Sequence, residues 1–96
     1  MPACKDKWFL YLIRCKTGQL YTGITTNVQR RLTEHQCGKG AKYLRGKDPL
    51  QLVFQQEIGS RSEALKIEST IKKLPKEAKE TIIRSGQYVI PLRASE

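Results

Sequence analysis

The chain has 96 residues, the length of one small domain. Its 18 Lys and Arg residues outnumber nine Asp and Glu residues, which gives a formal net charge of +9. No apolar stretch approaches membrane-spanning length, so a transmembrane protein is excluded. The basic charge favours a phosphate-rich partner such as nucleic acid, and a merely solvated basic surface is an equally good interpretation of charge alone.

The three cysteines, at positions 4, 15 and 37, include no Cys-x-x-Cys pair. An odd number without that spacing indicates neither a disulfide framework nor a zinc knuckle. Cys15 falls in an apolar run and is interpreted as a small core residue. Reduced thiols and an N-terminus without an apolar signal segment predict a cytoplasmic protein.

Two short strands open the predicted domain. An apolar run rich in aromatic residues predicts a strand over Trp8–Cys15, and Leu20–Ile24 predicts a second. Residues 16–19 form a glycine-containing turn, so the two strands are expected to pair as a hairpin. Gly23 lies near the end of the second strand, where the backbone can approach another group closely.

A helix and a basic loop follow the hairpin. Residues 26–29 have the spacing of a capping box that begins a helix over Asn27–Gln36. Cys37 and Gly38 end that helix. Residues 38–47 are basic and punctuated by glycines, which predicts a loop with at most one helical turn.

One further strand and two helices complete the predicted fold. Alternating polarity predicts a strand over Leu50–Glu57, and a second capping box at Ser60–Glu63 begins a helix over Arg61–Leu74. Pro75 separates it from a short final helix over Lys76–Arg84. The expected fold is therefore α+β, with a small three-stranded antiparallel sheet flanked by helices in the order β-β-α-β-α-α. The domain spans 8–86, between a tail over 1–7 and a loosely packed tail over 87–96.

A small number of residues are candidates for chemistry. Glu68 lies within or beside the apolar stripe of its helix, where a carboxylate is costly unless it is paired or binds a metal ion. The structural alternative is an ion pair with Lys72, four residues later. Arg31 and His35 lie on one helical face, and they suit phosphate binding and proton movement or, equally, an ordinary helix surface.

Tyr11 and Tyr21 stand on the two neighbouring strands of the hairpin, where each can expose a hydroxyl at the sheet face. A tyrosine beside a metal ion and a cation can ionise below its usual pKa and activate water. The alternative interpretation is cross-strand aromatic packing.

Taken together, these segments resemble the GIY-YIG nuclease superfamily. Residues 9–11 (Phe-Leu-Tyr) and 21–23 (Tyr-Thr-Gly) are similar to the paired motifs that name it, with Phe9 and Leu10 replacing Gly and Ile, and Thr22 replacing Ile. Residues 24–35 resemble the first family helix, and residues 64–68 resemble the second. The similarity spans residues 8 to about 85 and is greatest to the short stand-alone bacterial proteins of the UPF0213 group.

This resemblance implies a metal-dependent endonuclease that hydrolyses phosphodiester bonds, in DNA rather than RNA, with little sequence specificity. Glu68 is expected to hold one Mg²⁺ or Mn²⁺ ion, and Arg31 to neutralise charge on the phosphate. Tyr11 or Tyr21 would position or deprotonate the attacking water, in an order that the resemblance leaves open. His35 would accept a proton from a tyrosine or contact phosphate.

Substrate binding is assigned to the basic loop and to Gly23, which lets nucleic acid approach the sheet. The loop residues assigned to this role are Lys39, Lys42, Tyr43, Arg45 and Lys47. Such a surface reads the backbone rather than the bases, so structure-dependent cutting, nonspecific cutting or targeting by a protein partner is expected. The alternatives are a nucleic-acid-binding module without catalysis and a scaffold that docks an acidic protein. No membrane partner is expected.

Overall fold

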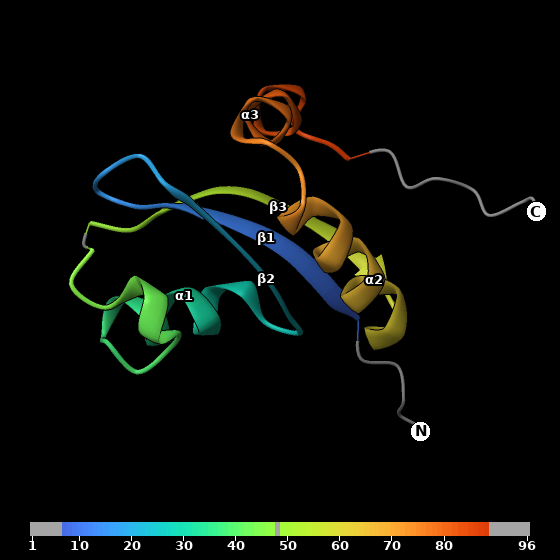
Figure 1. Ribbon diagram of the computed structural model, residues 1–96. Coiled ribbons are helices and arrows are strands. Elements are labelled where there is room, and N and C mark those ends of the chain that lie inside the picture. The colour runs from blue at the N-terminus through green and yellow to red at the C-terminus, as the bar shows by residue number, and fades with distance from the viewer. Residues whose placement is uncertain (1–6, 48, 89–96) are drawn as a thin grey trace, which may run out of the picture.

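A three-stranded antiparallel sheet forms the centre of the computed structural model, which describes residues 7–47 and 49–88 (Figure 1). β1 (Trp8–Arg14) lies between β2 (Leu20–Thr25) and β3 (Gln51–Gly59). In this register Tyr11 is directly opposite Gly23. The predicted sheet and hairpin are therefore confirmed, and β3 extends two residues beyond its expected end.

Three α-helices and one short 3₁₀ helix follow the hairpin in the predicted order. They are α1 (Val28–Gln36), η1 (Lys42–Leu44), α2 (Arg61–Lys72) and α3 (Lys76–Ser85). The order β-β-α-β-α-α is confirmed, and η1 is the single turn expected in the basic loop. Within the described residues, no helix has both the length and the apolar character needed to cross a membrane.

The helix ends differ from the predicted ones by a few residues. α1 is capped by Asn27, whose Oδ1 accepts a hydrogen bond from the Arg30 N–H at 3.0 Å, and not by Thr26. Ser60 caps α2 as predicted, accepting from the Glu63 N–H at 3.3 Å. α2 ends at Lys72 rather than Leu74, because proline disfavours helical geometry in the residue before it.

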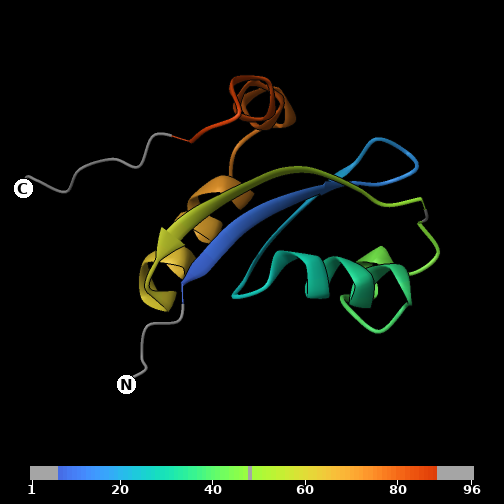
Figure 2. The same cartoon turned by 180° about the vertical axis from the view of Figure 1, so that it is seen from behind.

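The sheet separates two hydrophobic clusters, because alternate side chains of a strand point to opposite faces. The α2/α3 face buries Leu10, Leu12, Phe54, Ile67, Ile71 and Ile82. The α1/η1 face buries Tyr11, Ile13, Cys15, Val28, Leu44 and Leu50, which confirms Cys15 as a core residue. Seen from behind, α1 and α2 lie at different ends of the curved sheet (Figure 2).

Two long-range polar contacts attach the C-terminal part of the chain to the sheet. Arg14 and Glu80 form a bidentate ion pair at 2.7 and 2.8 Å between β1 and α3. The Gln56 side chain on β3 bonds both the N–H and the C=O of Tyr88, at 2.7 and 3.0 Å. The loosely packed tail predicted from residue 87 is therefore wrong at Tyr88, while residues 89–96 and 1–6 lie outside the described part of the chain.

Candidate active site

Tyr11 is the centre of the candidate site. It lies in the middle of β1, its side chain points to the α1/η1 face, and it is only 2% exposed. A Cβ atom added to Gly23, directly across the hairpin, would overlap the Tyr11 hydroxyl. Gly23 therefore makes room for the Tyr11 phenol; the sequence indicated a close approach to the backbone here but did not identify Tyr11 as the approaching group. The predicted contact between Gly23 and substrate stays a prediction.

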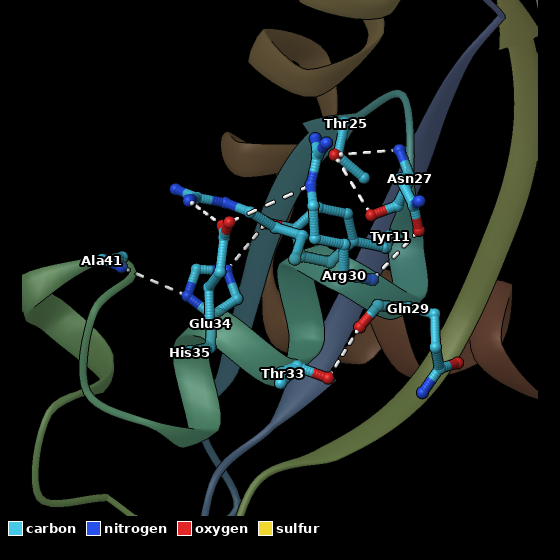
Figure 3. A network of polar contacts seen from close by, with 10 residues as sticks. Tyr11, Thr25, Asn27, Gln29, Arg30, Thr33, Glu34, His35 and Ala41 are labelled. Carbon is cyan, nitrogen blue, oxygen red and sulfur yellow. Dashed lines mark hydrogen bonds and ion pairs between the residues drawn. The ribbon is translucent and has the colours of Figure 1, made fainter.

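His35 lies beside Tyr11 in the last turn of α1 and is also 2% exposed. Its Nε2 atom is 2.9 Å from the Tyr11 hydroxyl oxygen. Its Nδ1 atom accepts a hydrogen bond from the backbone N–H of Ala41, at 3.1 Å (Figure 3). Gly40 permits this approach, because a Cβ atom there would overlap the imidazole ring.

Tyr21 packs against the same pair from β2. Its ring centroid is 6.4 Å from that of Tyr11 and 5.5 Å from that of His35, whose ring it meets edge-on. Because Tyr21 is opposite Ile13, it lies diagonally across the hairpin from Tyr11, on the same face. The structure thus brings together three of the predicted residues, and it also contains the cross-strand aromatic packing considered as their alternative role.

Arg31 extends from α1 toward Tyr11 and also contacts the Glu34 carboxylate. Its Nη1 atom donates to Glu34 Oε1 at 2.9 Å, and Arg30 Nε lies 3.9 Å from the other Glu34 oxygen (Figure 3). The hydrogen bond from Arg31 lowers the pKa of Glu34 below its ordinary value. Sequence spacing places Glu34 three residues after Arg31, but it did not mark this carboxylate as part of the site.

The Tyr11 hydroxyl experiences opposing electrostatic effects. Burial, followed by the charge of Tyr21, raises its pKa from 10.0 to about 12, and the Glu68 carboxylate adds to the rise. A polar contact with Arg31 and the charge of that guanidinium act in the opposite direction. In the free protein Tyr11 is therefore a neutral phenol near pH 7, and the charges of both Arg31 and Glu68 act on it.

Glu68 lies in the middle of α2 with only 17% of its side chain exposed. Its Oε2 atom is 3.3 Å from Lys72 Nζ, so the ion pair considered from the sequence is present. Its charge still acts on the Tyr11 hydroxyl, whose pKa it helps to raise. The structure therefore contains the ion pair, and the predicted role of Glu68 as a metal ligand stays a prediction.

The donor set suits a metal ion that is only partly held by protein. Among residues 7–47 and 49–88, no group of three His, Cys, Asp or Glu side chains could enclose a metal ion. Mg²⁺ and Mn²⁺ prefer oxygen ligands, and Mg²⁺ commonly takes one or two carboxylates together with waters and substrate phosphate. The single carboxylate of Glu68 fits that mode of binding. It does not fit a site in which protein side chains supply most of the ligands.

The basic loop folds back over the edge of this aromatic group. The Tyr43 ring stacks on Tyr21 at a centroid distance of 6.0 Å, and Lys47 Nζ lies 3.7 Å from its centre. The Tyr43 hydroxyl donates to Gln19 Oε1 at 3.1 Å, in the turn between β1 and β2. Tyr43 remains 45% exposed, but these contacts constrain the ring that was expected to stack on a base.

The charged loop side chains differ in their surroundings. Lys39, Lys42 and Arg45 are exposed, whereas Lys47 is partly buried. Arg45 Nε donates to the Gly38 carbonyl oxygen at 3.2 Å, which stabilises the loop itself. Their predicted contacts with substrate stay predictions, on a surface next to the Tyr11–His35 pair.

Known proteins are similar to this chain in both sequence and fold. The GIY-YIG catalytic domain family matches residues 7–81. A UPF0213 protein of Cronobacter sakazakii is 60% identical over 78 residues, which cover 81% of this chain and 82% of the relative. The UPF0213 protein YE0453 of Yersinia enterocolitica is 60% identical over 76 residues, covering 79% and 78% of the two chains.

Two solution NMR structures are similar to this chain. The UPF0213 protein BH0048 of Bacillus halodurans is 40% identical, with a TM-score of 0.54, and the match covers 82% of this chain and 84% of that one. The protein EF2693 of E. faecalis is 34% identical, with a TM-score of 0.60, over 93% and 97% of the chains. The chain therefore belongs to the GIY-YIG domain family, a family of nucleases, and groups within it with the UPF0213 proteins.

Proposed function

We propose that this protein is a metal-dependent endonuclease that hydrolyses phosphodiester bonds in DNA, with little sequence specificity. The observation that carries the proposal is the buried Tyr11 hydroxyl, which lies 2.9 Å from His35 and within the electrostatic influence of Arg31 and Glu68. A phenol that can orient water, a permanent cation that can bind phosphate and a carboxylate that can hold a metal ion are together a set of groups suited to phosphodiester hydrolysis. Membership of a nuclease family supports the same chemistry.

Glu68 would hold the divalent ion, and that ion would supply Lewis-acid stabilisation of the phosphate and leaving oxygens. Lys72 contacts Glu68 Oε2, so a metal ion would bind the other carboxylate oxygen or take the place of Lys72. This exchange has a low energetic cost, because an ion pair with an exposed lysine contributes little stability in water.

Arg31 would bind the scissile phosphate. Its guanidinium can donate two hydrogen bonds to phosphate oxygens and keeps its charge at every physiological pH. In the free protein Glu34 accepts one of these donors at 2.9 Å, so phosphate must displace Glu34 or share Arg31 with it. Arg31 would then stabilise the charge that develops on the phosphoryl oxygens.

Either of the two tyrosines would orient the attacking water. Tyr11 is buried and hydrogen-bonded to His35, whereas Tyr21 is half-buried between His35 and Tyr43. A tyrosine whose pKa is about 12 is a poor base until a nearby positive charge lowers it, so bound cation and Arg31 together favour ionisation of Tyr11.

A second function is favoured by a specific observation. Arg31 and Glu68 are each paired with an opposite charge, Glu34 and Lys72, in the free protein. A module that only binds nucleic acid needs positive potential and no release of these pairs. The alternative is therefore a non-catalytic nucleic-acid-binding domain that uses the same basic face.

Cleavage assays distinguish the two functions. Branched, nicked and single-stranded DNA, and RNA, are incubated with the protein and Mg²⁺ or Mn²⁺, and in parallel with a chelator. We expect metal-dependent cleavage of DNA, and a loss on the order of a hundredfold or more in Glu68→Gln. The matched control is Glu63→Gln, an exposed carboxylate on the same helix, which should cut like the parent protein.

The two failures have different meanings. If the protein binds nucleic acid in a salt-sensitive way but cleaves none of the substrates with either metal ion, the binding module is established instead. Equal cleavage by the parent and by Glu68→Gln would mean that the activity does not arise from this site.

A further inference from the structure

His35 uses both ring nitrogens, and one of its partners can only donate. The backbone N–H of Ala41 points to Nδ1 at 3.1 Å, so Nδ1 must be the unprotonated, accepting nitrogen. A neutral imidazole then carries its hydrogen on Nε2. Because Nε2 is 2.9 Å from the Tyr11 oxygen, this hydrogen is donated to the phenol.

The segment that provides this N–H is held close to the ring. Gly40 has no side chain, and a Cβ atom at that position would overlap Nδ1 and its neighbours. Ala41 has extended backbone angles, with φ −65° and ψ 136°. It is partly buried and packs against the α1/η1 core. Substituting Gly40 would therefore push the Ala41 amide away from His35.

We propose that the backbone amide of Ala41 is a positioning group that fixes His35 as the Nε2-protonated tautomer, so that His35 donates a hydrogen bond to the Tyr11 oxygen. This inference deepens the proposed function, on which only its catalytic consequence rests. The geometry comes from two hydrogen bonds to one buried ring, and it holds whether or not the protein cuts nucleic acid.

The consequence concerns the Tyr11 hydrogen. While Nε2 carries a hydrogen, it cannot accept one from Tyr11, so the hydroxyl hydrogen of Tyr11 is directed to another acceptor. A phenolate formed at Tyr11 would retain the hydrogen bond from His35, which favours the charged form. His35 therefore orients Tyr11 and stabilises its anion, in place of the sequence-based suggestion that it removes the tyrosine proton.

The same amide belongs to the loop that is expected to bind substrate. Ala41 is next to Lys42 and two residues after Lys39, and both lysines are exposed. A phosphate held by these lysines would act on the segment that fixes the tautomer. Substrate binding by these lysines would therefore be connected to the hydrogen-bonding state of Tyr11 through one backbone N–H.

Nitrogen NMR tests this inference directly, because His35 is the only histidine in the chain. Long-range ¹H–¹⁵N correlation spectra of the full-length labelled protein distinguish a protonated from an unprotonated ring nitrogen. We expect an unprotonated Nδ1 and a protonated Nε2 at pH values where the ring is neutral. A protonated Nδ1, or equal averaging between the two tautomers, would overturn the assignment.

Two substitutions test whether the amide selects the tautomer. Ala41→Pro removes the N–H at a φ angle that proline adopts, and Ala41→Ser keeps the N–H. We expect the serine variant to retain the parental pattern and the proline variant to shift both nitrogens toward averaged values. A parental pattern in Ala41→Pro would show that another contact selects the tautomer. If that variant does not fold, Gly40→Ala provides the same test by displacing the amide.

The catalytic consequence has its own measurement. Ala41→Pro should slow cleavage on the order of a hundredfold, the loss typical when a reacting group is misplaced by about 1 Å. Cys37→Ser, at an exposed position just after the end of α1, should cut like the parent. Unchanged cleavage by Ala41→Pro with a shifted tautomer would overturn the catalytic part of the inference. If the parent protein cuts nothing, the proposed function fails, and the spectra alone still decide the tautomer.

Discussion

The two faces of the sheet are built by different rules, although β1 contributes alternate residues to both. The α2/α3 face is a cluster of aliphatic and aromatic side chains whose burial needs no polar partner. The α1/η1 face buries Tyr11 and His35 among its apolar side chains, and each of the two has a hydrogen-bond partner. The comparison indicates that the α2/α3 face mainly stabilises the fold. The α1/η1 face buries fewer purely apolar side chains and instead holds polar groups in fixed positions.

Truncation of the apolar face should have the largest effect on stability. Ile71 is fully buried on α2, and Ile71→Ala should lower the free energy of unfolding by about 2–5 kcal/mol, measured by chemical denaturation. Leu65→Ala shortens a 39% exposed side chain on the same helix and should cost far less. Similar losses in the two variants would contradict the assignment of this face as the stabilising core.

Crowding the polar face should affect cleavage more than stability. In Gly23→Ala the new methyl group overlaps the Tyr11 hydroxyl, so the phenol or the hairpin must move. We expect a loss of about 1–3 kcal/mol in unfolding free energy. The cleavage rate should fall by more than this loss explains, measured under conditions where both proteins are fully folded. A stable variant that cuts at the parental rate would show that the position of Tyr11 is not critical.

The two buried threonines of β2 provide a matched comparison of the faces. Thr22 points to the α2/α3 face, and its Oγ1 has no hydrogen-bond partner among the described residues, so Thr22→Val should stabilise the protein by about 1 kcal/mol. Thr25 is equally buried, but its Oγ1 accepts from the Asn27 N–H at 3.1 Å. Thr25→Val should therefore destabilise the protein. Thermal melting of both variants checks the opposite signs.

The pH dependence of stability should report the burial of His35. Burial, followed by the charge of Arg31, lowers the pKa of His35 below its ordinary 6.5, and Glu34 opposes the shift. The unfolded chain then binds a proton more readily than the folded one, so unfolding free energy falls as the pH drops below 6.5. In His35→Gln this part of the slope should vanish. An unchanged slope between neutral pH and pH 5 would indicate a different titrating group.

Local sequence patterns predicted the fold because its determinants are local. Alternation in the strands, a glycine-containing turn and the Ser60 cap each act within a few residues, and the structure contains all three elements. The small errors occur where two local signals compete, as at Asn27 and at the residues before Pro75. Tyr88 was missed because its partner, Gln56, is 32 residues away.

The candidate site was predictable in its members but not in their pairings. Spacing and family resemblance identified Tyr11, Tyr21 and His35, which the fold brings into contact. The contribution of Gly40 depends on a loop closing over a ring from another element, and no period in the sequence encodes that closure. Likewise, no sequence signal singled out Glu34, although its side chain accepts a hydrogen bond from Arg31.

The dual membership of β1 has a consequence for how this chain can change over evolution. Tyr11 and its neighbours Leu10 and Leu12 belong to opposite layers solely because of odd and even position along one strand. A single inserted or deleted residue there would exchange the two sets, sending the phenol among aliphatic side chains and leucine toward the imidazole. Natural variants of this strand should therefore differ by substitution and keep its length constant.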